Sequence, residues 1–327
     1  MNKKPIKLLP AFKDYLWGGE KLRTHYGKQT DISPLAESWE LSTHKDGQSI
    51  VASGQYMGLS LSEYIEKIGK DALGKRAERF DYFPLLIKLI DAKKSLSVQV
   101  HPSDEYAMRV EGEYGKSEMW YIVDCDEGAF IYYGFSRDVS REEYESAIKD
   151  GTLTSILNAV PVKRGDAFYI EAGTVHAIGA GILICEIQQN SNTTYRVFDF
   201  NRRDKNGNLR ELHIDKALEV SNLKKSPAIK EISDENEVTL ALCEYFEVKR
   251  LKVDRESEIS VDGESFLSII SIDGDAKLIF EGGELDISLG ESVFVPANAG
   301  KMMIKGKCQL ILSRIGDKYN LEDFLCI

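Results

Sequence analysis

Residues 83–102 read FPLLIKLIDAKKSLSVQVHP, and the end of this stretch carries the pattern that decides the fold. In SVQVHP, Ser97, Gln99 and His101 alternate with two valines. A β-strand would therefore direct the three polar side chains to one face and the valines to the other. Burying a polar face costs free energy unless its groups are bound. The stretch predicts a strand whose polar face binds a ligand.

Two residues farther along the chain could complete a metal site on this face. Glu118 lies in GKSEMWYIV and His176 lies in EAGTVHAIGAG. With Gln99 and His101 they offer two imidazoles, a carboxylate and an amide oxygen, which suits Zn²⁺, Mn²⁺, Co²⁺ or Fe²⁺. The set contains no thiolate, so we expect no closed structural zinc site. An ion held by these four ligands can still accept a water or a substrate oxygen.

The histidines allow a plainer interpretation. A lone histidine in a strand is more often a hydrogen-bonded core or surface residue than a ligand, so the metal hypothesis depends on the whole set. The chain has five histidines. His25, His44 and His213 lie in turn-like or polar segments and are predicted to be surface residues. His101 and His176 lie in strand-like segments next to turns, which leaves them as the candidates.

Composition narrows the classes of protein and partner. The chain has 327 residues and a formal net charge of −11, which argues against a nucleic-acid or anionic-membrane surface but allows one basic pocket for a small anion. No run approaches the roughly 18 to 20 apolar residues of a membrane helix. The basic start lacks the apolar core of a signal peptide, so we expect a cytoplasmic protein. The five cysteines include no CxxC pair and are predicted to be reduced and buried.

Short apolar runs separated by glycine and other turn residues predict a mainly β protein, built as a barrel or jelly roll. The spacing of apolar residues becomes typical of a helix near 60–80 and 140–158. Ser60 with Glu63 and Ser140 with Glu143 fit capping boxes at the starts of these segments. Shorter helices are expected around 103–109 and within 213–223. A polar, proline-containing stretch at 224–237 predicts a linker. We therefore expect a catalytic barrel at 1–235 and a second barrel at 236–327, with an amphipathic tail at 321–327.

A motif that occurs twice in the chain supports the prediction of two barrels. Gly165-x5-Glu171-Ala172-Gly173-x2-His176 has a counterpart in Gly290-x5-Pro296-Ala297-Asn298-x2-Lys301. Both resemble the second signature of the cupin jelly roll, in which a metal-binding histidine closes the motif. Lys301 stands in place of that histidine, and no histidine follows His213. The second barrel is therefore expected to lack this kind of metal site and to have a structural or interface role.

Five motifs in order resemble the type I mannose-6-phosphate isomerases, in particular the short bacterial form: YLWGG, LIKLIDAKKSLSVQVHP, GKSEMW, EAGTVHAIGAG and EIQQNSNTTYRVFDF. They cover most of residues 10–215. The resemblance implies two cupin barrels with a small helical insertion. It also implies metal ligation by Gln99, His101, Glu118 and His176, with one zinc ion as the typical metal.

The resemblance also marks further site residues. It implies that Arg196 is the active-site arginine, that Lys116 and Glu186 lie in the pocket, and that Trp17, Lys88 and Ser97 occupy pocket positions. Arg202, at the place of a lysine in the longer members, is a weaker candidate for a phosphate contact. Taken alone, Lys116 could be a solvated loop charge, Glu186 a strand residue paired with a lysine, and Trp17 a core residue beside a turn. Gly115 and Asn192 replace a histidine and an aspartate of the longer members, so acid and base roles built on those residues do not carry over.

The implied reaction interconverts mannose 6-phosphate and fructose 6-phosphate through a cis-enediol. The metal and Arg196 would stabilise the developing negative charge, with Glu186 as general base and Lys116 as proton donor or oxyanion partner. Two other classes remain open: a sugar-phosphate-binding cupin without activity, and a metal-dependent cupin oxygenase. The expected partner is a small sugar phosphate, and the expected assembly is a monomer or a weak homo-oligomer.

Overall fold

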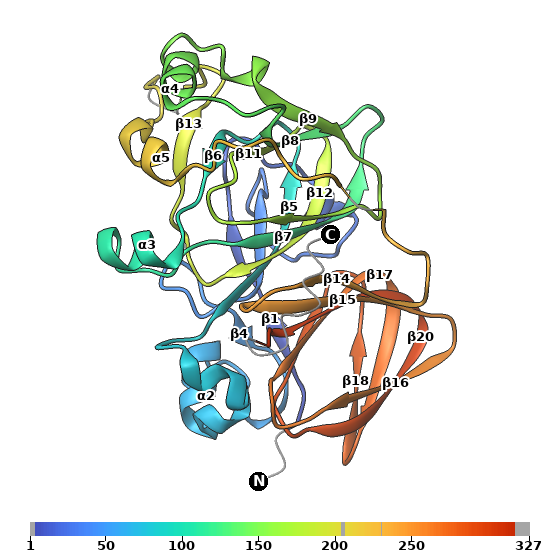
Figure 1. Cartoon of the computed structure of the whole chain (residues 1–327). Helices are drawn as coiled ribbons and strands as arrows, with labels where there is room; N and C mark the ends of the chain where they lie inside the picture. Colours follow the sequence, from blue (N-terminus) through green and yellow to red (C-terminus); the bar gives the residue numbers. More distant parts are fainter. Residues whose placement is uncertain (1–3, 204–206, 230, 318–327) are drawn as a thin grey trace.

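A computed structural model of the chain describes residues 4–203, 207–229 and 231–317, so the predicted tail at 321–327 and Cys326 lie outside the described residues. The fold is mainly β and forms three antiparallel sheets, as the sequence predicts (Figure 1). The described cysteines form no disulfide with one another, and all but Cys125 are buried. No helix among these residues is long and apolar enough to cross a membrane.

Two sheets build the first barrel. The six-stranded sheet runs β10 (Ala167–Ile170), β7 (Glu118–Cys125), β12 (Ile182–Gln189), β5 (Leu85–Ala92), β3 (Glu37–Leu41), β2 (Ala11–Lys13). The five-stranded sheet runs β13 (Tyr195–Phe198), β6 (Val98–Val100), β11 (His176–Ile178), β8 (Phe130–Phe135), β9 (Leu157–Pro161). One apolar cluster draws side chains from both sheets, among them Trp120, Ile131 and Ile184, and fills the space between them.

The third sheet has nine strands. Its main path runs β14 (Glu237–Leu242), β15 (Phe246–Val253), β20 (Gly300–Ile315), β17 (Leu267–Phe280), β19 (Ser292–Val295), β1 (Ile6–Leu9), β4 (Ile50–Val51), with β16 (Glu256–Val261) on β20 and β18 (Gly283–Ile287) on β17. Because β1 pairs with β19, this sheet takes strands from both ends of the chain. The division at residue 235 stays a prediction.

The central strands of the first barrel are buried on both faces. In β5, every residue from Leu85 to Ala92 is buried. One face of β5, β7 and β12 lines the barrel, while the other joins the cluster that includes Phe246 and Phe294 of the third sheet. Such double burial explains why LLIKLIDA reads as a nearly continuous apolar run. It also makes the exceptions, Lys88 and Asp91, informative.

Helices cover the outside of the barrels. The predicted cap at Ser60 and Glu63 forms, but the helix α2 (Leu61–Ile68) ends at Gly69, and 3₁₀ turns follow at η2 (Lys70–Leu73) and η3 (Lys75–Arg79). The helix α4 (Arg141–Lys149) ends near Gly151, whose φ of 69° favours glycine. A turn, η4 (Leu153–Ser155), and the strand β9 occupy the end of the segment 140–158 that was predicted to be helical.

The remaining helices are short: α1 (Lys21–Thr24), α3 (Asp104–Val110), α5 (Ile214–Val220) and the turn η1 (Gly54–Tyr56). The helices α4 and α5 pack over the outer face of the five-stranded sheet, where Val98 and Val100 join their cluster. The valines of SVQVHP therefore face this cluster, as the alternation predicts.

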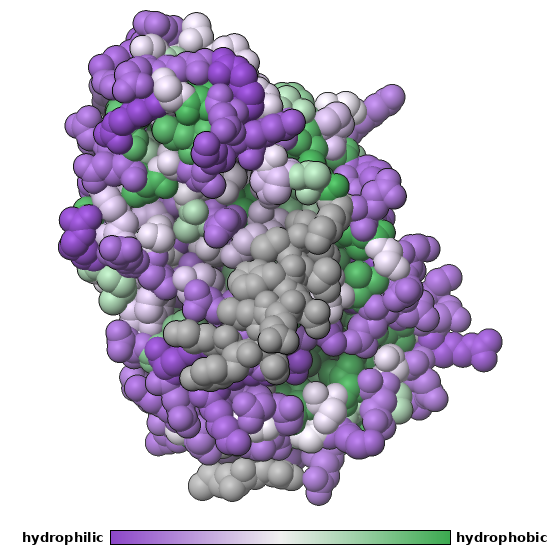
Figure 2. Space-filling view, in the orientation of Figure 1, coloured by the Kyte–Doolittle hydropathy of each residue, from purple (hydrophilic) through white to green (hydrophobic). Residues whose placement is uncertain are grey.

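Figure 2 shows that the face of the molecule in view is mainly hydrophilic, with apolar groups scattered over it.

Candidate metal centre and active site

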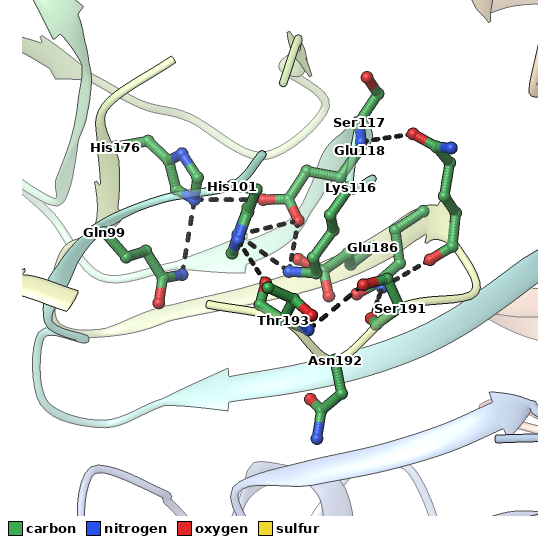
Figure 3. Close-up of polar contacts among 12 residues, drawn as sticks. Gln99, His101, Lys116, Ser117, Glu118, His176, Glu186, Ser191, Asn192 and Thr193 are labelled. Carbon is green, nitrogen blue, oxygen red and sulfur yellow. Dashed lines mark hydrogen bonds and ion pairs between the residues drawn. The ribbon is translucent and has the colours of Figure 1, made fainter. Parts of the chain in front are cut away.

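The predicted ligands come together at one end of the first barrel. Gln99 lies in β6 and pairs with His176, the first residue of β11, while His101 directly follows β6. Glu118 is the first residue of β7, in the other sheet of the barrel. One ligand atom from each of His101, Glu118 and His176 lies within 4.8 Å of the others, and all three residues are buried (Figure 3).

Backbone carbonyl groups orient both imidazoles. His101 Nδ1 lies 2.9 Å from the carbonyl oxygen of Thr193, and His176 Nδ1 lies 2.8 Å from that of Thr174. Each neutral ring therefore donates from Nδ1 and directs the lone pair of Nε2 toward Glu118, at 3.6 Å for His101 and 3.4 Å for His176. Burial lowers the pKa of His101 well below its usual value and that of His176 to about 3. Both rings are neutral near pH 7, as metal ligation requires.

The carboxylate of Glu118 fits a cation. Its Oε1 is buried and has no hydrogen-bond partner among the residues that the structure describes, although it lies 3.4 Å from the lone pair of His176 Nε2. A buried carboxylate oxygen facing an imidazole lone pair is unfavourable unless a proton or a metal ion lies between them. Burial and the nearby Glu186 raise the pKa of Glu118 to about 7, although Lys116 acts to lower it.

The side-chain amide of Gln99 also lies beside the imidazole of His176. Its Nε2 lies 3.4 Å from His176 Nε2, and rotation about the last side-chain bond exchanges the amide nitrogen for the oxygen. Gln99 is partly exposed, whereas the other three side chains are buried. The four candidate ligands therefore form a shell that is open on the side of the amide.

Lys116 is buried beside the candidate ligands. Its Nζ lies 2.8 Å from Glu118 Oε2 and 3.0 Å from His101 Nε2. Only 4% of the residue is exposed, so the alternative of a solvated loop charge is wrong. The loop that carries it is held back against the chain after β6, because Lys116 N donates to the carbonyl of Pro102.

A second buried charge pair lies in the same sheet. Antiparallel register places Trp39 opposite Lys88, Lys88 opposite Glu186, and Glu186 opposite Trp120. Lys88 Nζ lies 3.1 Å from Glu186 Oε2, and Trp120 Nε1 donates to Glu186 Oε1 at 2.9 Å. The ammonium also lies 5.2 Å from the centre of the Trp39 ring, within the range of a cation–π contact.

The two charges shift one another's pKa. Burial acts to raise the pKa of Glu186, but Lys88 and Lys116 outweigh it and lower the value to about 2. Burial acts to lower the pKa of Lys88, but Glu186 and Glu37 outweigh it and raise the value. Both groups are therefore ionised at neutral pH. The alternative for Glu186, a strand carboxylate paired with a lysine, describes its contacts correctly and leaves open whether it also acts on substrate.

Glu37 belongs to this cluster and was not singled out in the sequence. Its Oε2 accepts a hydrogen bond of 2.7 Å from Trp39 Nε1 and lies 4.0 Å from Lys88 Nζ. The alternation of ESWEL could have placed Glu37 and Trp39 on one strand face. It could not have shown that Lys88 lies opposite that face.

The remaining predicted residues lie in different settings. Arg196 in β13 lies opposite Gln99, donates to Ser97 Oγ at 3.3 Å, and is partly exposed. Arg202 donates to Asp199 and to the carbonyl of Ser95. Trp17 is 5% exposed and belongs to the apolar cluster inside the barrel, so its place in a substrate pocket stays a prediction.

His44 was predicted to lie on the surface, and this is wrong. The residue is 6% exposed, because the turn after β3 folds back so that its ring lies 5.8 Å from that of Trp39. In the second barrel, Lys301 forms an exposed ion pair with Glu258. Among the described residues, the one cluster of three or more candidate histidine, cysteine or acidic ligands is that of His101, Glu118 and His176.

A barrel of this kind, with two imidazoles and a carboxylate gathered at one end, defines a metal-binding protein of the cupin type. The sequence matches the family models for the phosphomannose isomerase type I catalytic domain, over residues 6–128, and for the mannose-6-phosphate isomerase cupin domain, over residues 236–315. The chain belongs to the type I mannose-6-phosphate isomerase family, and the predicted fold and family are confirmed.

Known relatives are similar in sequence to this chain over nearly its whole length. The chain is 39% identical to the putative mannose-6-phosphate isomerase YvyI of Bacillus subtilis, over 96% of this chain and 100% of the relative. It is 38% identical to the mannose-6-phosphate isomerase ManA of Bacillus subtilis, with the same coverage. The crystal structure of the mannose 6-phosphate isomerase from Bacillus subtilis superimposes with a TM-score of 0.87 at 37% identity, over 95% of this chain and 99% of the other.

Proposed function

We propose that this enzyme interconverts mannose 6-phosphate and fructose 6-phosphate at the end of the first barrel that holds His101, Glu118 and His176. The observation that carries the proposal is the convergence of these three side chains with the buried ammonium of Lys116, in a chain of this family. Binding alone does not require such a set. The alternatives of a binding protein without activity and of an oxygenase have no specific observation in their favour.

The proposed cofactor is one zinc ion, with other divalent metals as substitutes. Gln99, His101, Glu118 and His176 would hold it, and the neutral imidazoles and the unpartnered oxygen of Glu118 support this assignment. When bound, the ion supplies a Lewis acid that polarises substrate oxygens.

The protein's own residues would move the protons. Glu186 takes the proton from C2 of the open-chain aldose, the electrons of the C–H bond form the C1–C2 double bond, and O1 accepts a proton or a hydrogen bond from Lys116. The proton on O2 then passes to Lys116 if Lys116 has protonated O1, or to O1 itself if Lys116 has only donated a hydrogen bond. The C2=O2 bond forms, and the electrons of the C1–C2 double bond take the proton back from Glu186 at C1, which gives the ketose. Arg196 stabilises the negative charge that develops on the enediol oxygens.

The phosphate would be held by cationic and hydroxyl groups near the site. Ser97 and Lys88 are the proposed contacts, and Arg202 is the third. Arg202 already donates to Asp199 and Ser95, and a guanidinium with five N–H groups has further donors for a phosphate. A phosphate that draws Lys88 away from Glu186 would raise the pKa of this carboxylate and make it a stronger base.

A coupled assay on mannose 6-phosphate tests the proposal. Turnover should disappear when a chelator removes the metal and return when zinc is added. No turnover with metal restored would reject the isomerase, binding of the sugar phosphate without turnover would indicate a binding protein, and chelator-sensitive O₂ consumption would indicate an oxygenase.

Variants separate the proposed roles. His101→Ala and Glu118→Ala should lower both metal content and turnover, whereas Arg196→Ala should lower turnover with the metal still bound. Full zinc retention in the first two variants would reject the ligand assignment. An unchanged rate in the third would remove Arg196 from the mechanism.

The wider organisation is also proposed. Residues 236–327 form a second barrel without metal ligands, and the enzyme is a cytoplasmic monomer or weak homo-oligomer. Its net charge of −11 is unfavourable for nucleic acid and for anionic membranes. Light scattering across a concentration series would test the assembly state.

A further inference from the structure

The orientation of His101 depends on a loop outside the ligand set. The ring donates from Nδ1 to the carbonyl oxygen of Thr193, in the loop that follows β12 (Figure 3). A backbone carbonyl that accepts from the far nitrogen of a metal-binding imidazole sets its tautomer and its direction. Whatever holds Thr193 in place therefore acts on His101.

Glu113, in the segment between α3 and β7, holds this loop. Its Oε2 accepts from the Thr193 hydroxyl at 3.3 Å and lies 3.4 Å from the donating backbone nitrogen of Asn192. Both contacts are long, but they reach two consecutive residues of the loop from one carboxylate oxygen. The side chain of Glu113 is 17% exposed, which limits screening by solvent.

The other oxygen of Glu113 faces two basic side chains. Lys45 Nζ lies 2.8 Å from Oε1, and His44 Nε2 lies 3.7 Å from the same atom. His44 Nδ1 accepts from the backbone nitrogen of Asp46 at 3.1 Å, so the neutral ring carries its proton on Nε2 and points it toward Glu113. Asp46 also lies 3.5 Å from Nδ1 and adds a second carboxylate on the far side of the ring.

These groups keep the carboxylate ionised. Partial burial acts to raise the pKa of Glu113, but the hydrogen bonds from Lys45 and from the backbone of Asn192 outweigh it and lower the pKa. Burial lowers the pKa of His44, so the ring itself is neutral at pH 7. An ionised acceptor makes stronger hydrogen bonds than a neutral one.

We infer that Glu113 is a positioning residue for the metal centre, which acts through Thr193 on the orientation of His101. The inference rests on the proposed function, because it gives His101 the role of a ligand. Glu113 itself contacts none of the four candidate ligands in the described structure; its effect passes through one loop residue.

The loop has other anchors that do not involve Glu113. Asn190 donates to the carbonyl of Phe83 at 2.8 Å, and Gln188 donates to the carbonyl of Ser191 at 2.7 Å. Loss of the carboxylate should therefore free the end of the loop at Thr193 and leave the fold intact. A positioning role and a stabilising role thus predict different results.

The experiment compares Glu113→Ala, Glu113→Gln and the control Glu105→Ala, an exposed glutamate of α3, the helix that precedes the segment of Glu113. Zinc affinity is measured by competition with a chelating indicator, and the unfolding temperature is measured on the metal-free proteins. We expect Glu113→Ala to weaken zinc binding by about 10- to 100-fold, the usual range for a residue that supports a ligand. Glu113→Gln should recover part of this loss, because its amide oxygen still accepts from the loop but more weakly than a carboxylate. Glu105→Ala should bind zinc like the wild type, and all metal-free proteins should unfold within about 3 °C of it.

Zinc affinity of Glu113→Ala within roughly twofold of the wild type would overturn the inference. So would a fall in the metal-free unfolding temperature large enough to account for the loss. If Glu113→Ala does not fold, Thr193→Val removes the same hydrogen bond from the other side and should weaken zinc binding in the same direction. A wild-type protein that binds no zinc would overturn the proposed function as well, whereas normal wild-type binding with an unaffected variant would overturn only the inference.

Discussion

Replacement of Lys88 by methionine tests the buried charge pair most directly. Methionine keeps the approximate length of the side chain and removes the ammonium that lies 3.1 Å from Glu186 Oε2. The two side chains are 5% and 4% exposed, so solvent cannot replace the lost partner. The variant leaves Glu186 as a buried carboxylate whose nearest cation is gone.

Two independent arguments give the magnitude. Removal of one partner of a buried ion pair costs about 3–5 kcal/mol of unfolding free energy. The lowering of the pKa of Glu186 from 4.5 to about 2 corresponds to roughly 3 kcal/mol, part of which comes from Lys116. We therefore expect Lys88→Met to lower the free energy of unfolding by about 3 kcal/mol at pH 7.

The pH dependence has a definite sign. In the wild type the pKa of Glu186 is lowered, so its stabilising contribution is complete above pH 4.5 and is lost only as the pH falls toward 2. In the variant the unpaired carboxylate has a raised pKa and takes up a proton as the pH falls. The difference in stability between wild type and variant should therefore be largest at pH 7 and smaller at pH 5.

Urea unfolding of the metal-free proteins, followed by tryptophan fluorescence, measures this difference, because Trp39 and Trp120 flank the pair. The double variant Lys88→Met/Glu186→Gln removes both charges and keeps an acceptor for Trp120. It should regain most of the stability and remain inactive. A loss below about 1 kcal/mol at pH 7, or a double variant less stable than the single one, would refute the reasoning.

Three further predictions concern the site and the contact between the barrels. Zinc affinity should fall by up to about tenfold for each pH unit below 7, because the pKa of Glu118 is about 7 and its proton competes with the metal. Competition titrations at pH 8, 7 and 6 measure this dependence, and a zinc affinity that does not change with pH would contradict it. Lys116→Met should lower turnover by at least about 100-fold, because it removes the proposed proton donor. Zinc binding should not weaken, because the variant also removes a cation that lies 2.8 Å from an oxygen of the candidate ligand Glu118. Metal analysis and the coupled assay test this, and loss of metal from the variant would argue against it. Lys28 forms an ion pair of 2.5 Å with the buried Glu40 and also donates to the carbonyl of Gly290 in the second barrel. Lys28→Met should lower the unfolding free energy by about 3–5 kcal/mol, because it leaves the carboxylate of Glu40 buried without this cation. Thermal unfolding measures the loss, and a change below about 1 kcal/mol would show that the pair contributes little.

Local pattern was enough to predict much of the site. Alternation in SVQVHP placed Gln99 and His101 on the face opposite the valines, and the structure confirms that those valines pack under α4 and α5. The helix starts at Ser60 and Ser140 were predicted, because a capping side chain bonds within its own first turn. The helix ends were not: helix was expected to about 80 and 158, whereas α2 ends at Gly69 and α4 near Gly151. The order of five motifs was enough for the family, and the relatives confirm it.

Other features depended on which strands become neighbours. The sequence by itself determined the strand faces, the helix caps and the residue types available as ligands, because these depend on residues within a few positions of one another. Only the tertiary structure brought Glu37 beside Lys88, buried Lys116 and His44, paired β1 with β19 and linked Glu113 to Thr193. Those contacts arise from antiparallel register and from loops that meet at one end of the barrel. Register between distant strands is set by the packing of the whole sheet, and no short stretch of sequence contains that information.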